Sequence, residues 1–133
     1  MMNYITQLYD LAKQCRDNAY APYSRFKVGS AIRCGHFFCG GCNVENISYP
    51  CGICAEAGAV AALAAAGYTN IDEIMIVADT ENIIPCGSCL QKISEFGTPD
   101  TIIYSADLNG NIRTYRLSEL LPHNFNASEV KNA

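Results

Sequence analysis

The stretch "YPCGICAEAGAVAALAAAG", residues 49–67, places two cysteines before a long alanine-rich run, and "IPCGSC", residues 84–89, repeats its beginning. Alanine has the highest helix propensity, and Gly67 is the residue type that commonly follows the C-terminus of a helix. We therefore predict a largely buried helix over residues 54–66 and a second helix over residues 86–96. Both predicted helices begin at a Pro-Cys-Gly-x-Cys motif.

The segments on either side of these helices alternate between helix and strand patterns. Apolar residues at steps of three and four predict an amphipathic first helix, and the continuous apolar run "EIMIVAD" predicts a central strand covered on both faces. The expected remaining elements are a helix over 3–19, strands over 26–34, 37–45, 73–79, 101–106 and 112–117, and a short helix over 118–122. We predict a single three-layer α/β/α domain over residues 1–133, with one mixed five-stranded sheet.

Composition narrows the classes of partner. The chain has 133 residues, a formal net charge of −4 and no cluster of Lys and Arg, so it lacks the positive surface that dominates nucleic-acid affinity. It shows neither a secretory signal pattern nor an apolar run long enough to span a bilayer. We therefore expect a cytoplasmic protein that acts on a small molecule. Eight cysteines in such a chain favour metal binding or catalysis over a disulfide framework.

Three pairs of cysteines have the two-residue gap at which two thiolates can bind one metal ion. The pairs are Cys39 with Cys42, Cys51 with Cys54, and Cys86 with Cys89. One interpretation is a structural zinc site made by all four cysteines of the last two pairs. The other uses Cys54, Cys86 and Cys89 alone and leaves the fourth position to water, as catalytic zinc requires.

Glu56 follows two residues after Cys54, in the first turn of the predicted helix. A glutamate there can be a simple helix-capping residue, or it can carry a proton beside the metal. A helix N-terminus also presents free N–H groups and a positive dipole end, which stabilise anionic ligands. Both cysteine motifs begin where this effect applies.

The segments "NVEN", "CAE" and "PCGSC", in this order and spacing, resemble the cytidine deaminase family in its small homotetrameric, three-cysteine form. The resemblance extends from "AYAPYSRFKVG" to "ELLPHNF", nearly the whole chain. It implies zinc-dependent hydrolytic deamination of cytidine and 2′-deoxycytidine to uridine and 2′-deoxyuridine plus ammonia, a step of pyrimidine salvage. It also implies a homotetramer with shared active sites, and a nucleoside rather than a nucleic acid or membrane as partner.

The resemblance also implies individual roles. Cys54, Cys86 and Cys89 would bind Zn²⁺, and Glu56 would carry a proton from the attacking water to N3 of the cytosine. Cys51 would be a bystander. The substrate-binding residues implied are Phe26 against the base, Asn43 and Glu45 at the sugar hydroxyls, the backbone of Ala55 at the base, Phe125 from a neighbouring subunit, and Tyr49 at a subunit boundary or the substrate.

Asn43 and Glu45 are separated by one residue, which would place both on one face of a strand. Without the neighbouring motifs they would read as polar residues of a solvated strand face. The Asn-x-Glu pair counts against antibiotic-type relatives that act on other aminopyrimidine nucleosides, although that class of substrate stays an alternative.

The chain departs from the family at Ala57 and Leu90, where many relatives have an arginine that offsets thiolate charge. Arg25 and Lys27 are the nearest cations by motif. The loss of both arginines leaves open a second alternative, a deaminase-fold protein whose zinc is purely structural. The retained Glu56 argues against that alternative.

Overall fold

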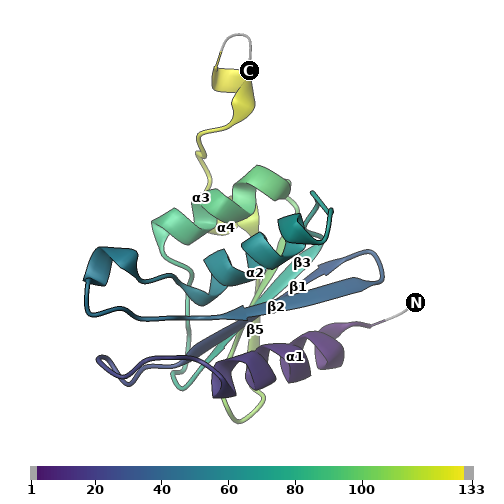
Figure 1. The fold of residues 1–133 in the computed structure, drawn as a ribbon. Helices are drawn as coiled ribbons and strands as arrows, with labels where there is room; N and C mark the ends of the chain where they lie inside the picture. Colours follow the sequence, from purple (N-terminus) through teal and green to yellow (C-terminus); the bar gives the residue numbers. More distant parts are fainter. Residues whose placement is uncertain (1–2, 131–133) are drawn as a thin grey trace.

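One five-stranded sheet runs through the protein, and helices cover both of its faces (Figure 1). The computed structural model describes residues 3–130. The strands are β1 (Val28–Cys34), β2 (Phe37–Cys42), β3 (Glu73–Ala78), β4 (Ile102–Ala106) and β5 (Ile112–Arg116), in the spatial order β2-β1-β3-β4-β5. The helices are α1 (Ile5–Asp17), α2 (Ala55–Ala65), α3 (Gly87–Phe96) and α4 (Leu117–Leu120), with 3₁₀ turns η1 (Tyr49–Cys51) and η2 (Ala127–Glu129).

The core has two parts, one on each face of the sheet. On one face, Leu8 and Ala12 of α1 pack in a buried cluster with Met75 of β3. On the other face, α2 and α3 bury Leu63 and Ile93 in a cluster that includes alternate residues of the same strand. The strand β3 is therefore covered on both sides, which explains its unbroken apolar sequence. The predicted three-layer α/β/α architecture with a mixed five-stranded sheet is confirmed.

The pairing of the strands brings the starts of α2 and α3 to one edge of the sheet. The strand β1 pairs antiparallel with both β2 and β3, so β2 and β3 run in the same direction. The chain leaves β2 toward α2 and leaves β3 toward α3, and both helices lie on the same face (Figure 1). Two helix N-termini consequently meet beyond the ends of two parallel-running strands, which is where open α/β sheets bind ligands.

Two glycines determine where α2 ends and how closely it packs on β2. At its C-terminus, Gly67 adopts φ = 91°, the N–H of Tyr68 donates to the carbonyl of Leu63 at 3.2 Å, and the N–H of Gly67 donates to the carbonyl of Ala64 at 3.0 Å. These two bonds form the Schellman motif, which explains why the helix stops here. Near its N-terminus the helix lies directly on β2, because a Cβ at Gly41 would come within 2.3 Å of the Ala59 nitrogen.

The predicted strand over residues 37–45 ends earlier than expected. The ladder with β1 stops at Cys42, and Val44 forms isolated bridges with Tyr20 and Ile53. Asn43 and Glu45 therefore lie just beyond β2, between two other segments of backbone.

None of the helices described within residues 3–130 combines the length and the apolar character that a membrane span requires.

Candidate metal centre and active-site pocket

Three thiols converge at the shared edge. The Sγ atoms of Cys54, Cys86 and Cys89 all lie within 4.8 Å of one another, and within residues 3–130 they make up the one set of metal-binding side chains this close together. Thiolate sulfur is a preferred ligand of zinc, and three such ligands leave one tetrahedral position for water or substrate. The donor set therefore fits a zinc ion with an open position.

The two cysteine motifs meet their helices at different points. Cys54, the second cysteine of the first motif, is the N-cap residue of α2, whereas Cys86, the first cysteine of the second motif, is the N-cap residue of α3. Cys89 lies one turn further into α3 and is buried. Cys51 is in η1 with its exposed thiol 3.5 Å from the Ser48 hydroxyl oxygen, outside the thiol cluster. The arrangement does not form a four-cysteine site.

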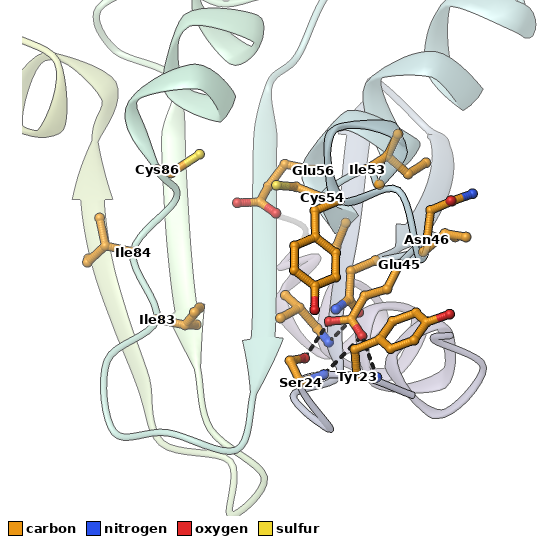
Figure 2. Close-up of a pocket in the computed structure, with 16 residues that line it drawn as sticks. Tyr23, Ser24, Glu45, Asn46, Ile53, Cys54, Glu56, Ile83, Ile84 and Cys86 are labelled. Atoms are coloured by element: carbon orange, nitrogen blue, oxygen red, sulfur yellow. Dashed lines mark hydrogen bonds between the residues drawn. The ribbon is translucent and has the colours of Figure 1, made fainter. Parts of the chain in front are cut away.

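Glu56 is the buried acid of the site. It is 6% exposed, and burial raises the pKa of its carboxyl, an effect partly offset by a hydrogen bond from the Cys89 thiol. Its side chain lines the pocket together with Cys54 and Cys86 (Figure 2). A buried carboxyl group with a raised pKa next to a metal-binding cluster is suited both to accept a proton and to return it.

The thiols differ in their surroundings. Hydrogen bonds from the backbone N–H of Cys89, and more weakly of Ser88, lower the pKa of the Cys86 thiol, as expected at a helix N-terminus. Burial raises the pKa of Cys54 and of Cys89, and the nearby Glu56 carboxylate raises both further. A bound cation would favour the thiolate form of Cys54 and Cys89 against this effect of burial.

No arginine stands at positions 57 and 90 to offset the charge of the thiolates, and neither Arg25 nor Lys27 replaces it. Ala57 is half-buried, and Leu90 is 6% exposed within the hydrophobic core. The Lys27 ammonium lies 3.5 Å from the backbone carbonyl of Asp17, and neither Lys27 nor Arg25 lines the pocket. Positive charge at the start of α3 comes from the helix N-terminus and from Lys92, whose ammonium donates to the Ser88 hydroxyl at 2.7 Å.

A cavity of about 630 Å³ opens over Glu56 and the thiols. Figure 2 shows Ile83, Ile84 and Cys86 on one side and Cys54, Glu45, Tyr23 and Ser24 on the other. Sequence reasoning missed nine of its lining residues, namely Tyr23, Ser24, Val28, Val44, Asn46, Gly52, Ile53, Ile83 and Ile84. Ile53 and Val44 stand at the unspecified positions of Pro-Cys-Gly-x-Cys and Asn-x-Glu, so those motifs do not reveal that they face the pocket.

Asn43 and Glu45 both line this cavity and bind the loop that precedes β1. The Asn43 Oδ1 accepts the N–H of Val28 at 2.9 Å, and its Nδ2 donates to the carbonyl of Phe26 at 2.8 Å. The Glu45 carboxylate accepts the hydroxyl and N–H groups of Ser24, which lower its pKa. The two side chains are therefore held by backbone and hydroxyl partners rather than pointing freely from a strand face.

The remaining residues expected near a substrate divide into two groups. Ala55 and Tyr49 line the cavity, and Tyr49 is 75% exposed. Phe26 and Phe125 do not line it within this chain. Phe125 is 64% exposed on the segment after α4, where the Gln91 side chain donates to its carbonyl at 2.6 Å.

The protein is an α/β protein of the class that holds a metal site at one edge of its sheet. The strand order, the two helix N-termini that meet there and the three clustered thiols are the features that place it in this class. Residues 2–105 match the family described as "Cytidine and deoxycytidylate deaminase zinc-binding region". The chain is 40% identical over 124 residues to a cytidine deaminase of Halalkalibacterium halodurans, covering 91% of this chain and 93% of that protein. It is 35% identical over 132 residues to a cytidine deaminase of Sporosarcina psychrophila, covering 97% and 96% of the two chains.

A solved structure agrees. The crystal structure of cytidine deaminase from Burkholderia pseudomallei superposes with a TM-score of 0.87 at 39% identity, covering 93% of this chain and 100% of that one. The chain belongs to the cytidine and deoxycytidylate deaminase family. The resemblance carried by the sequence motifs is confirmed, and zinc is the cofactor that the family and the thiol cluster support.

Proposed function

We propose that the protein is a zinc-dependent enzyme that deaminates cytidine and 2′-deoxycytidine hydrolytically, as a single domain over residues 1–133. The observation that carries the proposal is the buried Glu56 carboxyl beside three clustered thiols at the base of an open pocket. A structural zinc site has no need of a cavity or of a buried acid next to its ligands. The same geometry therefore argues against a purely structural role for the metal.

Cys54, Cys86 and Cys89 would hold the ion, which when bound supplies a Lewis acid that makes a water molecule nucleophilic near neutral pH. Glu56 takes a proton from that water and delivers it to N3 of the cytosine ring. Its burial supports this role, because a raised pKa lets one carboxyl accept and donate a proton in the same cycle. The backbone at Ala55, the first residue of α2, orients the base.

The pocket favours a nucleoside over a nucleotide. Among residues 3–130, those that line it include no Lys, Arg or His, while Glu45 and Glu56 both contribute carboxyl groups. The lowered pKa of Glu45 keeps that carboxyl ionised, so it accepts hydrogen bonds from sugar hydroxyls but repels a phosphate. Asn43 shares the sugar-binding role. Phe26, whose carbonyl accepts a hydrogen bond from Asn43 but which does not line the cavity in this chain, would pack against the base once substrate is bound.

Exposed apolar side chains support a homotetramer with shared active sites. Tyr49 and Ile53 line the pocket yet are 75% and 49% exposed, and Ile47 nearby in the chain is 74% exposed. Large apolar surfaces of this kind mark association sites. Phe125 is exposed on the C-terminal segment and would complete the site of a neighbouring subunit, and Tyr49 would lie at the same boundary.

We assign the protein to the cytoplasm.

Glu56→Gln tests the proposal. The wild-type protein is expected to convert cytidine to uridine, followed by absorbance near neutral pH, and the variant is expected to lose at least about 10³-fold in kcat because proton transfer is removed. Zinc content and circular dichroism should be unchanged. Glu95→Gln, at an exposed position on α3, is the matched control and should keep full activity.

Two outcomes would contradict the proposal. Wild-type turnover by the Glu56→Gln variant would remove the glutamate from the chemistry. Absence of cytidine turnover by zinc-loaded wild-type protein would move the activity to another aminopyrimidine nucleoside. Deoxycytidine 5′-monophosphate offered in parallel should be a poor substrate, because its phosphate would enter a pocket without cations.

A further inference from the structure

The side chain of Ser24 joins two parts of the pocket that the sequence motifs treat separately. Its hydroxyl donates to Oε2 of Glu45, and its oxygen accepts the N–H of Phe26 at 3.0 Å. Arg25, which separates Ser24 from Phe26 in the chain, has φ = 57°, a left-handed conformation uncommon for a residue other than glycine. The Ser24 hydroxyl therefore bridges Glu45 and the backbone of Phe26 across a strained residue.

The hydrogen bonds of Glu45 can be counted. An ionised carboxylate offers about four lone-pair positions. The N–H groups of Tyr23 and Ser24 occupy Oε1, at 3.0 and 3.1 Å, and the Ser24 hydroxyl occupies one position on Oε2. One position on Oε2 remains, on a residue that lines the cavity. The loop thus fixes the orientation of the carboxylate and leaves it able to accept one further hydroxyl.

We propose that Ser24 is a positioning residue for the sugar of the nucleoside, holding Glu45 so that its remaining oxygen lone pair meets a sugar hydroxyl. The inference rests on the proposed function. It goes beyond the roles of Asn43 and Glu45, because it assigns the orientation of Glu45 to a residue outside the Asn-x-Glu motif. It also links sugar binding to the position of Phe26, whose N–H and carbonyl are bound by Ser24 and Asn43 respectively.

A binding experiment separates this role from a general effect on folding. Calorimetric affinities are measured for uridine and for 2′,3′-dideoxyuridine, which lacks both sugar hydroxyls at those positions, with zinc-loaded wild-type and Ser24→Ala proteins. Loss of one bond that orients a charged acceptor is expected to weaken uridine binding by about tenfold. Binding of the dideoxy compound should change by less than about twofold, because it makes no bond to Glu45.

Two further variants complete the test. Ser24→Thr keeps a hydroxyl and is expected to restore uridine binding to within about threefold of wild type. Ser94→Ala removes a serine hydroxyl that donates to the Gln91 carbonyl in α3, away from the cavity, and should leave both affinities unchanged. In turnover of cytidine, Ser24→Ala should raise KM and leave kcat within about twofold, because the group acts on binding and not on proton transfer.

The results distinguish a failure of the role proposed for Ser24 from a failure of the proposed function. Equal losses for uridine and dideoxyuridine, or uridine binding in Ser24→Ala as tight as in wild type, overturn the role of Ser24 while leaving the proposed function intact. If wild-type protein neither deaminates cytidine nor binds uridine, the proposed function fails, and the inference fails with it. A selective loss with rescue by threonine supports both.

Discussion

The two Pro-Cys-Gly-x-Cys motifs are nearly identical in sequence and differ in structure by one turn. In the first motif the helix begins at the second cysteine, Cys54, and in the second motif it begins at the first cysteine, Cys86. The start of α2 therefore contributes one thiol and the acid Glu56, while the start of α3 contributes two thiols. A spacing motif by itself does not reveal which of its cysteines reach the metal, because the answer depends on where the helix starts.

The two helix starts also differ in how closely they are packed. The backbone of α2 lies directly on β2 at Gly41, where an added Cβ would meet the Ala59 nitrogen at 2.3 Å. Gly87, the first residue of α3, has no other group within 4 Å of such a Cβ. The half of the site that carries the acid is thus packed closely on the sheet, whereas the first residue of the helix that carries two thiols faces open space.

Exchanging one cysteine in each motif provides the sharpest test of the difference in helix start. Cys89→Ala should lower zinc affinity by more than about 100-fold and abolish cytidine turnover, because it removes a direct ligand. Cys51→Ala, the matched change in the other motif, should leave zinc content and activity unchanged. Metal analysis after dialysis against a chelator measures both. Loss of zinc from Cys51→Ala would show that the fourth cysteine binds the ion after all.

Arginine introduced at positions 57 and 90, where the chain departs from the family, should lower the free energy of unfolding by unequal amounts. Leu90 lies in the core under α3, so Leu90→Arg should destabilise the protein by about 3 kcal/mol or more through burial of an unpaired charge. Ala57 is half-buried, and Ala57→Arg should cost less than about 1 kcal/mol. Urea denaturation of the zinc-loaded proteins measures the free energy of unfolding. Wild-type stability in Leu90→Arg would indicate that the guanidinium reaches the thiolates.

Alanine at the two glycines probes packing with the smallest changes of side chain. Gly41→Ala should destabilise the protein by about 1–3 kcal/mol, because the new methyl group would force α2 away from β2. Gly87→Ala should be neutral or stabilise by up to about 1 kcal/mol, since it only restricts the unfolded chain. Thermal unfolding of the two variants compares them directly. Equal losses would mean that α3 is packed as tightly as α2.

Much of the fold could be predicted because its signals are local. The alanine run of α2 ended by Gly67, and the continuous apolar residues of β3, each express one physical preference over a short segment. The grouping of Cys54, Cys86 and Cys89 followed from motif resemblance, and the parallel direction of β2 and β3 explains why these residues meet.

What could not be predicted depends on contacts between distant segments. The strand β2 stops short of Asn43 because that side chain bonds to Val28 and to Phe26, fifteen or more residues earlier in the chain. The cavity wall made by Ile83 and Ile84 follows from the path between β3 and α3, for which residue spacing carries no signal. Leu90 likewise lies in the hydrophobic core, a position that the motif around it does not reveal.

The convergence of α2 and α3 on one thiol cluster has a consequence for folding cooperativity. An ion held by Cys54 and Cys86 closes a loop of chain that contains all of α2 and β3, the central strand of the sheet. Such a link restricts the unfolded chain, and an ion that binds only the assembled ligands stabilises the folded state, so metal binding and folding are coupled. The zinc that serves the chemistry would in this way also hold the fold together, and the stability of the native protein would follow the supply of the metal.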